Sequence, residues 1–180
     1  MKDLKSLIRA VPNFPKEGIK FFDITTLLKD GDGFRQACDQ MWEPFANAGV
    51  QKIAGIESRG FIFGAAMAYT QNLPFVLFRK PGKLPAETES ESYALEYGED
   101  QIEMHVDAVS PGERILIVDD LLATGGTAAA ACNLIEKLGG EVAGISMLVE
   151  LTFLPGRQKL EGRNLNFLFE FASESMDSDD

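Results

Sequence analysis

Two adjacent carboxylates stand directly ahead of a glycine-rich segment in the second half of the chain. Residues 115–131 read ILIVDDLLATGGTAAAA, so Asp119 and Asp120 follow a short apolar run typical of a buried strand. In open parallel sheets, ligands bind outside the carboxyl ends of the strands. The sequence therefore predicts a ligand site that begins at this acid pair.

The segment after the acid pair is suited to binding a phosphate. In ATGGT (123–127), Gly125 and Gly126 permit unusual dihedral angles and a close approach of the backbone to a ligand. Thr124 and Thr127 add hydroxyl groups, and a helix that begins near Thr127 adds the positive end of its dipole. Carboxylates repel phosphate but suit a sugar diol, Mg²⁺ or a developing cation, so the stretch predicts a ribose-phosphate site. The alternative is a tight strand-to-helix turn without a ligand.

Rival phosphate motifs do not fit this chain. It contains no GxxxxGK[ST], which disfavours a P-loop nucleotidase, and no GxGxxG after the first strand, which disfavours a dinucleotide-binding fold. A receiver-like phosphoacceptor domain would place its acid pair near the first strand, and here the pair lies at 119–120.

Strand-like and helix-like segments alternate around these residues, which predicts a central, mostly parallel sheet flanked by helices in an α/β fold. The expected strands are 52–56, 74–79, 115–118, 142–150 and 165–171, and the helices between them are 60–72 and roughly 127–138. Ahead of them we expect a helix over 3–11 capped by Asp3, an ordered loop or hood over 12–28, and a helix over 32–49 capped by Asp32 and divided by Pro44.

A polar stretch over residues 80–107 interrupts the alternation. It is rich in glutamate at its centre and ends in QIEMHV, which alternates like a strand. A long insert of this kind in a compact domain is typical of a lid, or of a surface hairpin without a role. We expect one domain over 1–180, with a hood at about 1–30, a flexible β-hairpin lid at about 81–107 and a disordered acidic tail at 173–180.

The composition narrows the function classes. The 180 residues carry 17 basic and 28 acidic side chains, a net charge of −11. This balance disfavours nonspecific nucleic-acid binding, but a basic pocket for a small phosphate can exist in an acidic protein. No stretch approaches the ~20 apolar residues of a membrane helix, and the N-terminus lacks a signal core, so we expect a cytoplasmic chain without membrane contact. Cys38 and Cys132 are predicted to be buried free thiols, and His105 a strand residue without chemistry.

Several segments resemble one enzyme family. ILIVDDLLATGGT resembles the phosphoribosyl-pyrophosphate (PRPP) signature of type I phosphoribosyltransferases. Other segments are similar to the adenine-specific branch of that family, follow its order and span nearly the whole chain. They are FPKEGIKFFDIT (14–25), AGIESRGFIFGAAMA (54–68), RKPGKLP (79–85), YALEYGED (93–100) and LPGRQKL (154–160).

The resemblance implies condensation of adenine with PRPP to give AMP and pyrophosphate, using Mg²⁺. Asp119 and Asp120 would face the ribose hydroxyls and stabilise an oxocarbenium-like transition state, with Mg²⁺ held mainly by PRPP near these two carboxylates. The 5′-phosphate would be held by Ala123, Thr124, Gly125, Gly126 and Thr127.

The resemblance also assigns residues to the pyrophosphate group. Ser58 and Arg59 would belong to a pyrophosphate loop with a cis peptide at Glu57–Ser58, and Arg59 would contact the diphosphate or the base. A basic cluster of Arg79, Lys80 and Lys83 would neutralise the leaving group. Part of this cluster serves the neighbouring subunit in the family, which implies a homodimer; an exposed Arg59 and a solvated charged turn are the alternatives.

The remaining implied roles concern adenine and the lid. Phe21 would stack on adenine with Leu121 on the opposite face, and backbone groups near Lys20 would read the purine. Glu96 would manage a proton on the purine ring, and Tyr97 would close over PRPP. The alternative for Phe21 is an aromatic side chain of the core, and the alternative for Glu96 is a solvated glutamate without a catalytic role.

One position departs from the family. Phe22 stands where relatives usually carry a basic residue. Two other functions stay open at this point: a transferase for xanthine, hypoxanthine or guanine, and a PRPP-sensing regulator that binds nucleic acid. The acidic charge and the lid argue against the regulator, and the base pocket decides between the purines.

Overall fold

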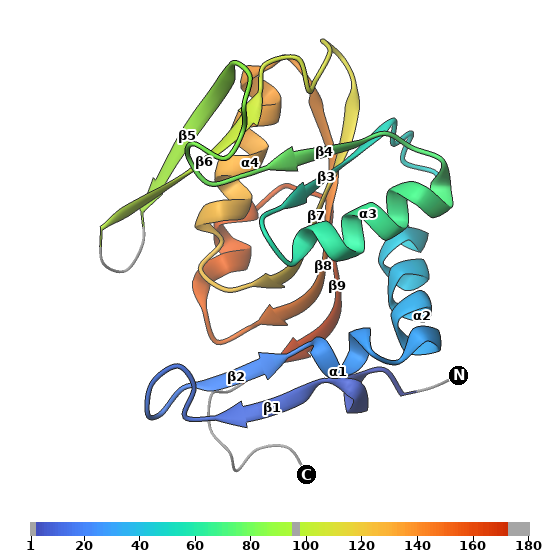
Figure 1. The fold of residues 1–180 in the computed structure, drawn as a ribbon, viewed down its shortest axis with the longest axis vertical. Coiled ribbons are helices and arrows are strands. Elements are labelled where there is room, and N and C mark those ends of the chain that lie inside the picture. The colour runs from blue at the N-terminus through green and yellow to red at the C-terminus, as the bar shows by residue number, and fades with distance from the viewer. Residues whose placement is uncertain (1–2, 95–97, 173–180) are drawn as a thin grey trace.

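A computed structural model describes residues 3–94 and 98–172 of the chain. Its centre is a parallel five-stranded sheet in the order β4-β3-β7-β8-β9, which confirms the predicted α/β class (Figure 1). Connections between parallel strands cross over the sheet, and the helices that make them cover its faces. The strands are β3 (Lys52–Ile56), β4 (Phe75–Phe78), β7 (Arg114–Leu122), β8 (Glu141–Leu151) and β9 (Leu165–Phe171).

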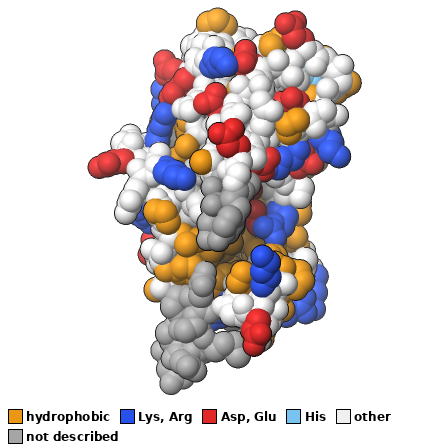
Figure 2. Space-filling view, turned by 90° about the vertical axis from the view of Figure 1, so that its left-hand side faces the viewer, with side chains coloured by type: hydrophobic (Ala, Val, Ile, Leu, Met, Phe, Trp, Pro, Cys, Tyr) orange, Lys and Arg blue, Asp and Glu red, His pale blue; other side chains and the backbone are white. Residues whose placement is uncertain are grey.

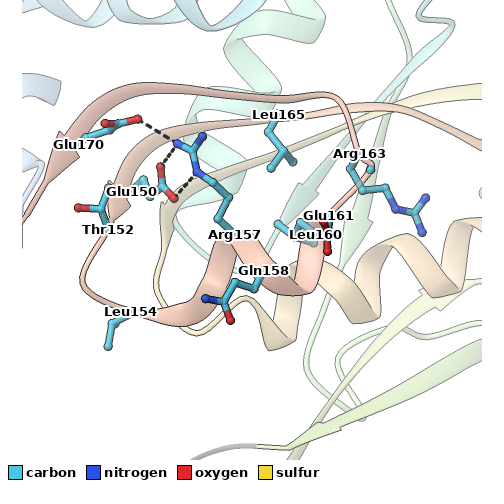
Figure 3. A pocket seen from close by; sticks show the side chains of 11 residues that line it. Glu150, Thr152, Leu154, Arg157, Gln158, Leu160, Glu161, Arg163, Leu165 and Glu170 are labelled. Carbon is cyan, nitrogen blue, oxygen red and sulfur yellow. Dashed lines mark hydrogen bonds and ion pairs between the residues drawn. The ribbon is translucent and has the colours of Figure 1, made fainter.

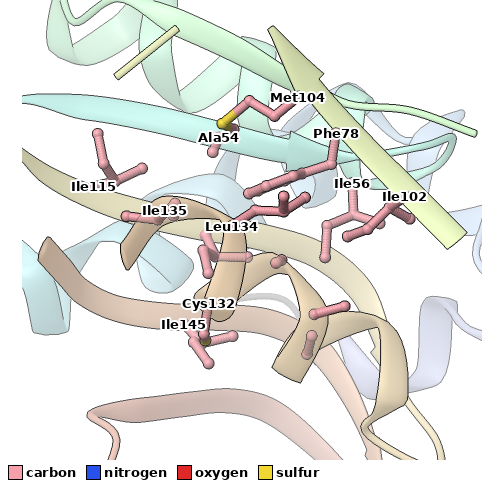
Figure 4. Packing of buried hydrophobic residues seen from close by; sticks show 14 of the residues in the cluster. Ala54, Ile56, Phe78, Ile102, Met104, Ile115, Cys132, Leu134, Ile135 and Ile145 are labelled. Carbon is pink, nitrogen blue, oxygen red and sulfur yellow. The ribbon is translucent and has the colours of Figure 1, made fainter. Parts of the chain in front are cut away.

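The helices divide between the two faces of the sheet because successive strand residues point in opposite directions. On β7, Ile115 and Ile117 pack into a cluster with α4 (Gly126–Lys137), as Figure 4 shows for part of this cluster. Leu116 and Val118 pack into a second cluster, which includes side chains of α2 (Gly31–Trp42) and α3 (Gly60–Gln71). Both faces of the sheet are therefore buried, as continuous apolar runs predict.

The N-terminal segment does not form the helix expected over 3–11. It contains a short 3-10 helix, η1 (Lys5–Leu7), followed by strand β1 (Arg9–Pro12). Strand β1 pairs antiparallel with β2 (Lys20–Asp23), with Arg9 opposite Asp23. The helix prediction was wrong because this pairing outweighs the weak local propensity of the segment.

The hood that contains β1, β2 and α1 (Thr25–Leu28) is anchored on the sheet cluster beside α2 and α3. The Phe22 ring stacks on the ring of Phe171 at 3.9 Å between centroids, and Phe22 is buried. This position therefore packs the hood against β9 instead of presenting a charge to the site.

Helix α2 starts and ends differently from the predicted 32–49. The Asp30 side chain accepts a hydrogen bond from the Gly33 N–H at 2.8 Å, so Asp30 is the cap in place of Asp32. The helix ends at Trp42, and a 3-10 turn, η2 (Glu43–Phe45), contains Pro44. The predicted division at Pro44 is confirmed, since proline cannot continue the hydrogen-bond ladder.

The stretch after β4 forms an antiparallel hairpin of β5 (Thr88–Ala94) and β6 (Glu99–His105) outside the main sheet (Figure 1). Ile102 and Met104 of β6 are buried in the α4 cluster. A further short 3-10 helix, η3 (Pro155–Leu160), joins β8 to β9. Within the described residues, no helix is long and apolar enough to cross a membrane.

Candidate active site

The acid pair lies inside the end of β7, because this strand continues to Leu122 instead of ending at residue 118. Its pairing with β8 extends as far as Leu122 opposite Glu150. Asp120 is buried at 6 % exposure, and its N–H donates a hydrogen bond to Asp119 Oδ1 at 2.9 Å. The strand thus fixes the backbone of both carboxylates.

The Arg59 side chain faces the pair. Arg59 Nε lies 2.7 Å from Asp120 Oδ2. Burial raises the pKa of Asp119 well above its ordinary value, and the negative charge of Asp120 raises it further. Burial also raises the pKa of Asp120, while the Arg59 guanidinium opposes that rise. The charged form of Asp119 is therefore poorly compensated, and an incoming donor or cation would stabilise it.

Glycines bring the neighbouring backbone close to the acid pair. A Cβ on Gly60, the first residue of α3, would lie 2.7 Å from Val118 O and 2.9 Å from Asp119 Oδ1. Gly125 has φ +77° and precedes Gly126, where α4 begins. The N-terminal turn of α4 is thereby placed directly after the acids in the chain, where its N–H groups suit an anion.

The loop over residues 57–60 has the expected backbone, since the Glu57–Ser58 peptide is cis. The Glu57 carboxylate accepts hydrogen bonds from Arg79 Nε at 3.1 Å and from the Lys80 N–H at 3.0 Å. The hydrogen bond from Arg79 holds the pKa of Glu57 below its ordinary value. Arg79 therefore connects the end of β4 to this loop.

Lys80 contacts the hairpin. Its Nζ donates to the Tyr93 hydroxyl at 2.9 Å and forms an ion pair with Asp100, and the Tyr93 hydroxyl donates to the same carboxylate at 3.0 Å. The hydrogen bond from Lys80 lowers the pKa of Asp100. The Tyr93 ring also lies 3.0 Å from the place of a Cβ on Gly126, so the hairpin packs against the start of α4.

A cavity of about 410 Å³ joins these groups at the carboxyl ends of β3 and β7. The arrows of the five-stranded sheet in Figure 1 point to the left, and Figure 2 looks onto that side, where acidic and basic side chains are interspersed above a hydrophobic area. Predicted site residues that line the cavity are Ser58, Arg59, Lys80, Asp119, Asp120, Leu121 and Thr127; Ile56, Glu57 and Tyr93 complete its lining.

Other predicted residues lie around this cavity without lining it. The Arg59 guanidinium lies 5.5 Å from the centroid of the Phe21 ring, which brings the hood to the site. Lys20 Nζ lies over the Phe22 ring at 5.7 Å, and Lys83 is exposed in the turn after β4. Ala123, Thr124, Gly125 and Gly126 form the connection into α4. Glu96 and Tyr97 lie outside the described residues.

Glu57, Tyr93 and Asp100 were not assigned roles from the sequence. Each belongs to a recognisable segment, ESRG or YALEYGED, but its basic partner, Arg79 or Lys80, comes from another segment. Their positions in these segments were therefore the only signal in the sequence that could have pointed to these residues. Their contacts become visible only in the folded structure.

The two carboxylates of the acid pair are of a kind and number that fit a magnesium ion held mainly by phosphate oxygens. Among the described residues, no three His, Cys, Asp or Glu side chains are grouped as a complete metal site. Mg²⁺ in phosphate-transfer sites keeps waters and substrate oxygens and uses only one or two protein carboxylates. Asp119 and Asp120 supply that number beside the predicted phosphate loop.

The two buried thiols have no place in this chemistry. Cys38 and Cys132 are both free and buried, as predicted. Burial raises the pKa of Cys38 to about 12 and that of Cys132 to about 11. Neither thiol is therefore activated as a nucleophile.

Comparison with known proteins identifies the fold and its relatives. The family model described as a phosphoribosyl transferase domain matches residues 27–163. An adenine phosphoribosyltransferase of Thermosynechococcus vestitus is 60 % identical over 158 residues, which are 88 % of this chain and 93 % of that protein.

Solved structures agree with this result. The crystal structure of adenine phosphoribosyltransferase from Thermoanaerobacter pseudethanolicus has a TM-score of 0.91 at 51 % identity and covers 94 % of this chain and 98 % of its own. The Saccharomyces cerevisiae enzyme, complexed with an imino-altritol bisphosphate and adenine, has a TM-score of 0.88 at 38 % identity, with 93 % and 97 % of the chains covered.

Proposed function

The chain belongs to the phosphoribosyl transferase family, among the adenine phosphoribosyltransferases, and we propose that its site transfers the 5-phosphoribosyl group of PRPP to adenine in purine salvage. A bond forms between a purine ring nitrogen and the anomeric carbon as the bond from that carbon to pyrophosphate breaks, and the ring nitrogen loses its proton. The products are AMP and pyrophosphate.

The observation that carries this proposal is the shared cavity of the acid pair, Arg59 and Thr127. Residues 123–127 would hold the 5′-phosphate through backbone N–H groups at the start of α4. Asp119 and Asp120 would accept hydrogen bonds from the ribose hydroxyls and stabilise the positive charge that develops at the anomeric carbon. Asp120 is buried and Asp119 is half-buried, which makes that stabilisation stronger than it would be in water.

The leaving group would meet the positive charges that line the same cavity. Lys80 and Arg59 line it together with Ser58. Arg79 and Lys83 would support them, Arg79 through its ion pair with Glu57. Pyrophosphate can replace Asp100 as the partner of Lys80, because both present anionic oxygens.

Adenine would lie between the hood and the sheet. Phe21 supplies an aromatic face next to Arg59, and Leu121 lines the cavity from β7. Backbone groups near Lys20 would read the edge of the base. Glu96 and Tyr97, which lie outside the described residues, would supply proton management and closure of the lid.

Magnesium is part of the proposal. The ion would be held mainly by the phosphates of PRPP, with Asp119 and Asp120 as the nearby protein carboxylates. When bound, the ion would neutralise negative charge on the diphosphate. The protein residues keep their own tasks, which are to bind the 5′-phosphate, orient the ribose and exclude water.

We also propose that the chain forms a homodimer. Helix α3 exposes Ile62 at 39 % and Tyr69 at 88 %, and these residues are seven positions apart and therefore on one side of the helix. A second copy would cover this face. Light scattering should give twice the chain mass for the wild type and a shift toward monomer for Tyr69→Glu; a monomeric wild type would contradict the proposal.

The proposed location is the cytoplasm, because PRPP and AMP are charged metabolites that do not cross membranes freely. Fractionation of cells that produce the native chain should place its activity in the soluble cytoplasmic fraction. Activity recovered outside the cell would contradict this location.

A panel of bases tests the proposed function. Purified protein is incubated with PRPP and Mg²⁺ and, separately, adenine, hypoxanthine, guanine or xanthine, and the nucleotide product is followed by chromatography. We expect AMP from adenine and at least ~10²-fold less product from the oxopurines, since a site that fits one hydrogen-bonding pattern rejects the other. Product from an oxopurine alone would overturn the assignment of the base; no product from any base would overturn the function.

A further inference from the structure

A second cavity, of about 690 Å³, is lined by residues of β8, η3 and β9 and of the segments that join them (Figure 3). Its lining includes Glu150, Arg157 and Glu170 and none of the residues that line the cavity of the acid pair. The segment LPGRQKL, which contains η3, was singled out by resemblance and has no role in the proposed reaction. The position of this segment beside the loop that enters α4 is therefore not accounted for by the proposed reaction.

The backbone of η3 approaches the phosphate loop closely at a point where both segments contain a glycine, Gly156 in η3 and Gly125 in the loop. A Cβ on Gly156 would lie 2.3 Å from Ala123 O and 2.9 Å from Leu122 Cγ. From the other side, a Cβ on Gly125 would lie 2.5 Å from Gly156 O. Any side chain at either position would separate the two segments, since such distances are far below ordinary van der Waals contact.

An ion-pair network holds η3 in this position. Arg157 Nε donates to Glu150 Oε1 at 2.8 Å, and Arg157 Nη2 pairs with Glu150 Oε2 and, at 2.9 Å, with Glu170 Oε1, as Figure 3 shows. Glu150 is 2 % exposed, and the Arg157 guanidinium lies 5.0 Å from the centroid of the Phe167 ring. The two-point contact fixes the direction of Arg157 as well as its distance.

The network connects directly to the strand that carries the acid pair. Glu150 of β8 is opposite Leu122 of β7, the residue that precedes the phosphate loop. Arg157 follows Gly156, so the residue that pairs with Glu150 is adjacent to the residue that touches Ala123. The loop is therefore bounded by β7 on one side and by η3 on the other.

We propose that Gly156 is a positioning residue for the phosphate loop, and that the Arg157–Glu150 pair keeps it there. The contact fixes the carbonyl of Ala123 and the backbone of Gly125, and thereby the direction of the N–H groups that would bind the 5′-phosphate. This inference rests on the proposed function, because it assigns the contact to phosphate binding.

The first test compares Gly156→Ala with Gly31→Ala. Gly31 begins α2, and a Cβ there would meet nothing within 4 Å, so this variant controls for the loss of glycine itself. The dissociation constant of ribose 5-phosphate is measured by calorimetry, and the Michaelis constants of PRPP and adenine by steady-state kinetics. We expect Gly156→Ala to weaken ribose 5-phosphate binding and raise the KM of PRPP by ~10-fold or more, with the KM of adenine within about twofold. Gly31→Ala should match the wild type.

The second test changes the ion pair and decides the matter if Gly156→Ala fails to fold. Arg157→Gln removes the cation, and Arg157→Lys keeps the charge but loses the two-point contact. We expect the KM of PRPP to rise most for Arg157→Gln and to an intermediate value for Arg157→Lys. A structural role without positioning would instead lower the fraction of active protein and leave both Michaelis constants unchanged.

The outcomes separate the two proposals. A wild type that fails to bind ribose 5-phosphate would overturn the phosphate site and the inference with it. A wild type that binds it, together with folded Gly156→Ala and Arg157→Gln proteins of unchanged affinity, would overturn the inference and leave the proposed function intact.

Discussion

Replacing Gly60 by alanine tests how closely the acid pair must be placed. The added Cβ would lie 2.7 Å from Val118 O and 2.9 Å from Asp119 Oδ1. To restore ordinary contact, the start of α3 and the end of β7 must separate by about 0.5–0.7 Å. Because the backbone of β7 is fixed by strands on both sides, we expect the Asp119 side chain to move as well.

The expected magnitudes follow from this displacement. Overpacking of a well-packed site costs about 1–3 kcal/mol in the free energy of unfolding. A misplacement of ~1 Å at a reacting centre can cost ~10²-fold in rate, so a smaller shift of the acid pair should lower kcat/KM for PRPP by ~10-fold or more. Gly31→Ala is the matched control, since Gly31 also begins a helix and its Cβ would meet nothing.

The assay combines urea unfolding with initial rates of AMP formation. Gly31→Ala should remain within about 0.5 kcal/mol of the wild type in stability and should keep its kcat/KM. If folded Gly60→Ala has the kcat/KM of the wild type, or if both variants lose activity equally, the acid pair does not need its observed position.

Three further predictions follow from charge and burial. Asp119→Asn should lower kcat/KM by ~10²-fold or more yet stabilise the ligand-free protein at neutral pH. Because the pKa of Asp119 is raised in the folded state, that state binds more protons, and the wild type loses stability as the pH rises through this pKa. Unfolding of both proteins from pH 4 to pH 8 should therefore show a stability difference that grows with pH. Hydrogen bonds from Arg9 and the Thr25 N–H lower the pKa of Asp23 from 3.8 to about 2. This pKa should return toward 3.8 in Arg9→Gln when both proteins are titrated by NMR. An unchanged pKa would refute the pairing of β1 with β2 at this point. Cys38 and Cys132 should not react with a thiol reagent at pH 8 until the protein is unfolded, and rapid reaction of either in the native state would contradict its burial.

The sequence predicts the buried strands well because their signal is local. Strands β3 and β9 have the predicted bounds, 52–56 and 165–171, since short apolar runs between turn residues leave little choice of pairing face. The helix predicted over residues 3–11 was wrong for the opposite reason. Its strand β1 exists because β2 is available as a partner, and a pairing between separate segments leaves no periodic pattern in one of them.

The same distinction applies to the site. The acid pair and the loop over 123–127 are contiguous in sequence, so their types and order indicate the chemistry before the fold is known. The contact of Lys80 with Tyr93 and Asp100 exists only because the hairpin folds back over α4. The sequence indicates that Lys80 belongs to a basic cluster, whereas its contacts with the hairpin can be identified only from the structure.

The most direct test of the central claim is a crystal structure of the protein with AMP. The account predicts the AMP phosphate within hydrogen-bond distance of the backbone N–H groups of residues 123–127, the ribose hydroxyls at Asp119 and Asp120, and the base between Phe21 and Leu121. A phosphate bound elsewhere, with the acid pair still paired only to Arg59, would contradict the assignment of this site.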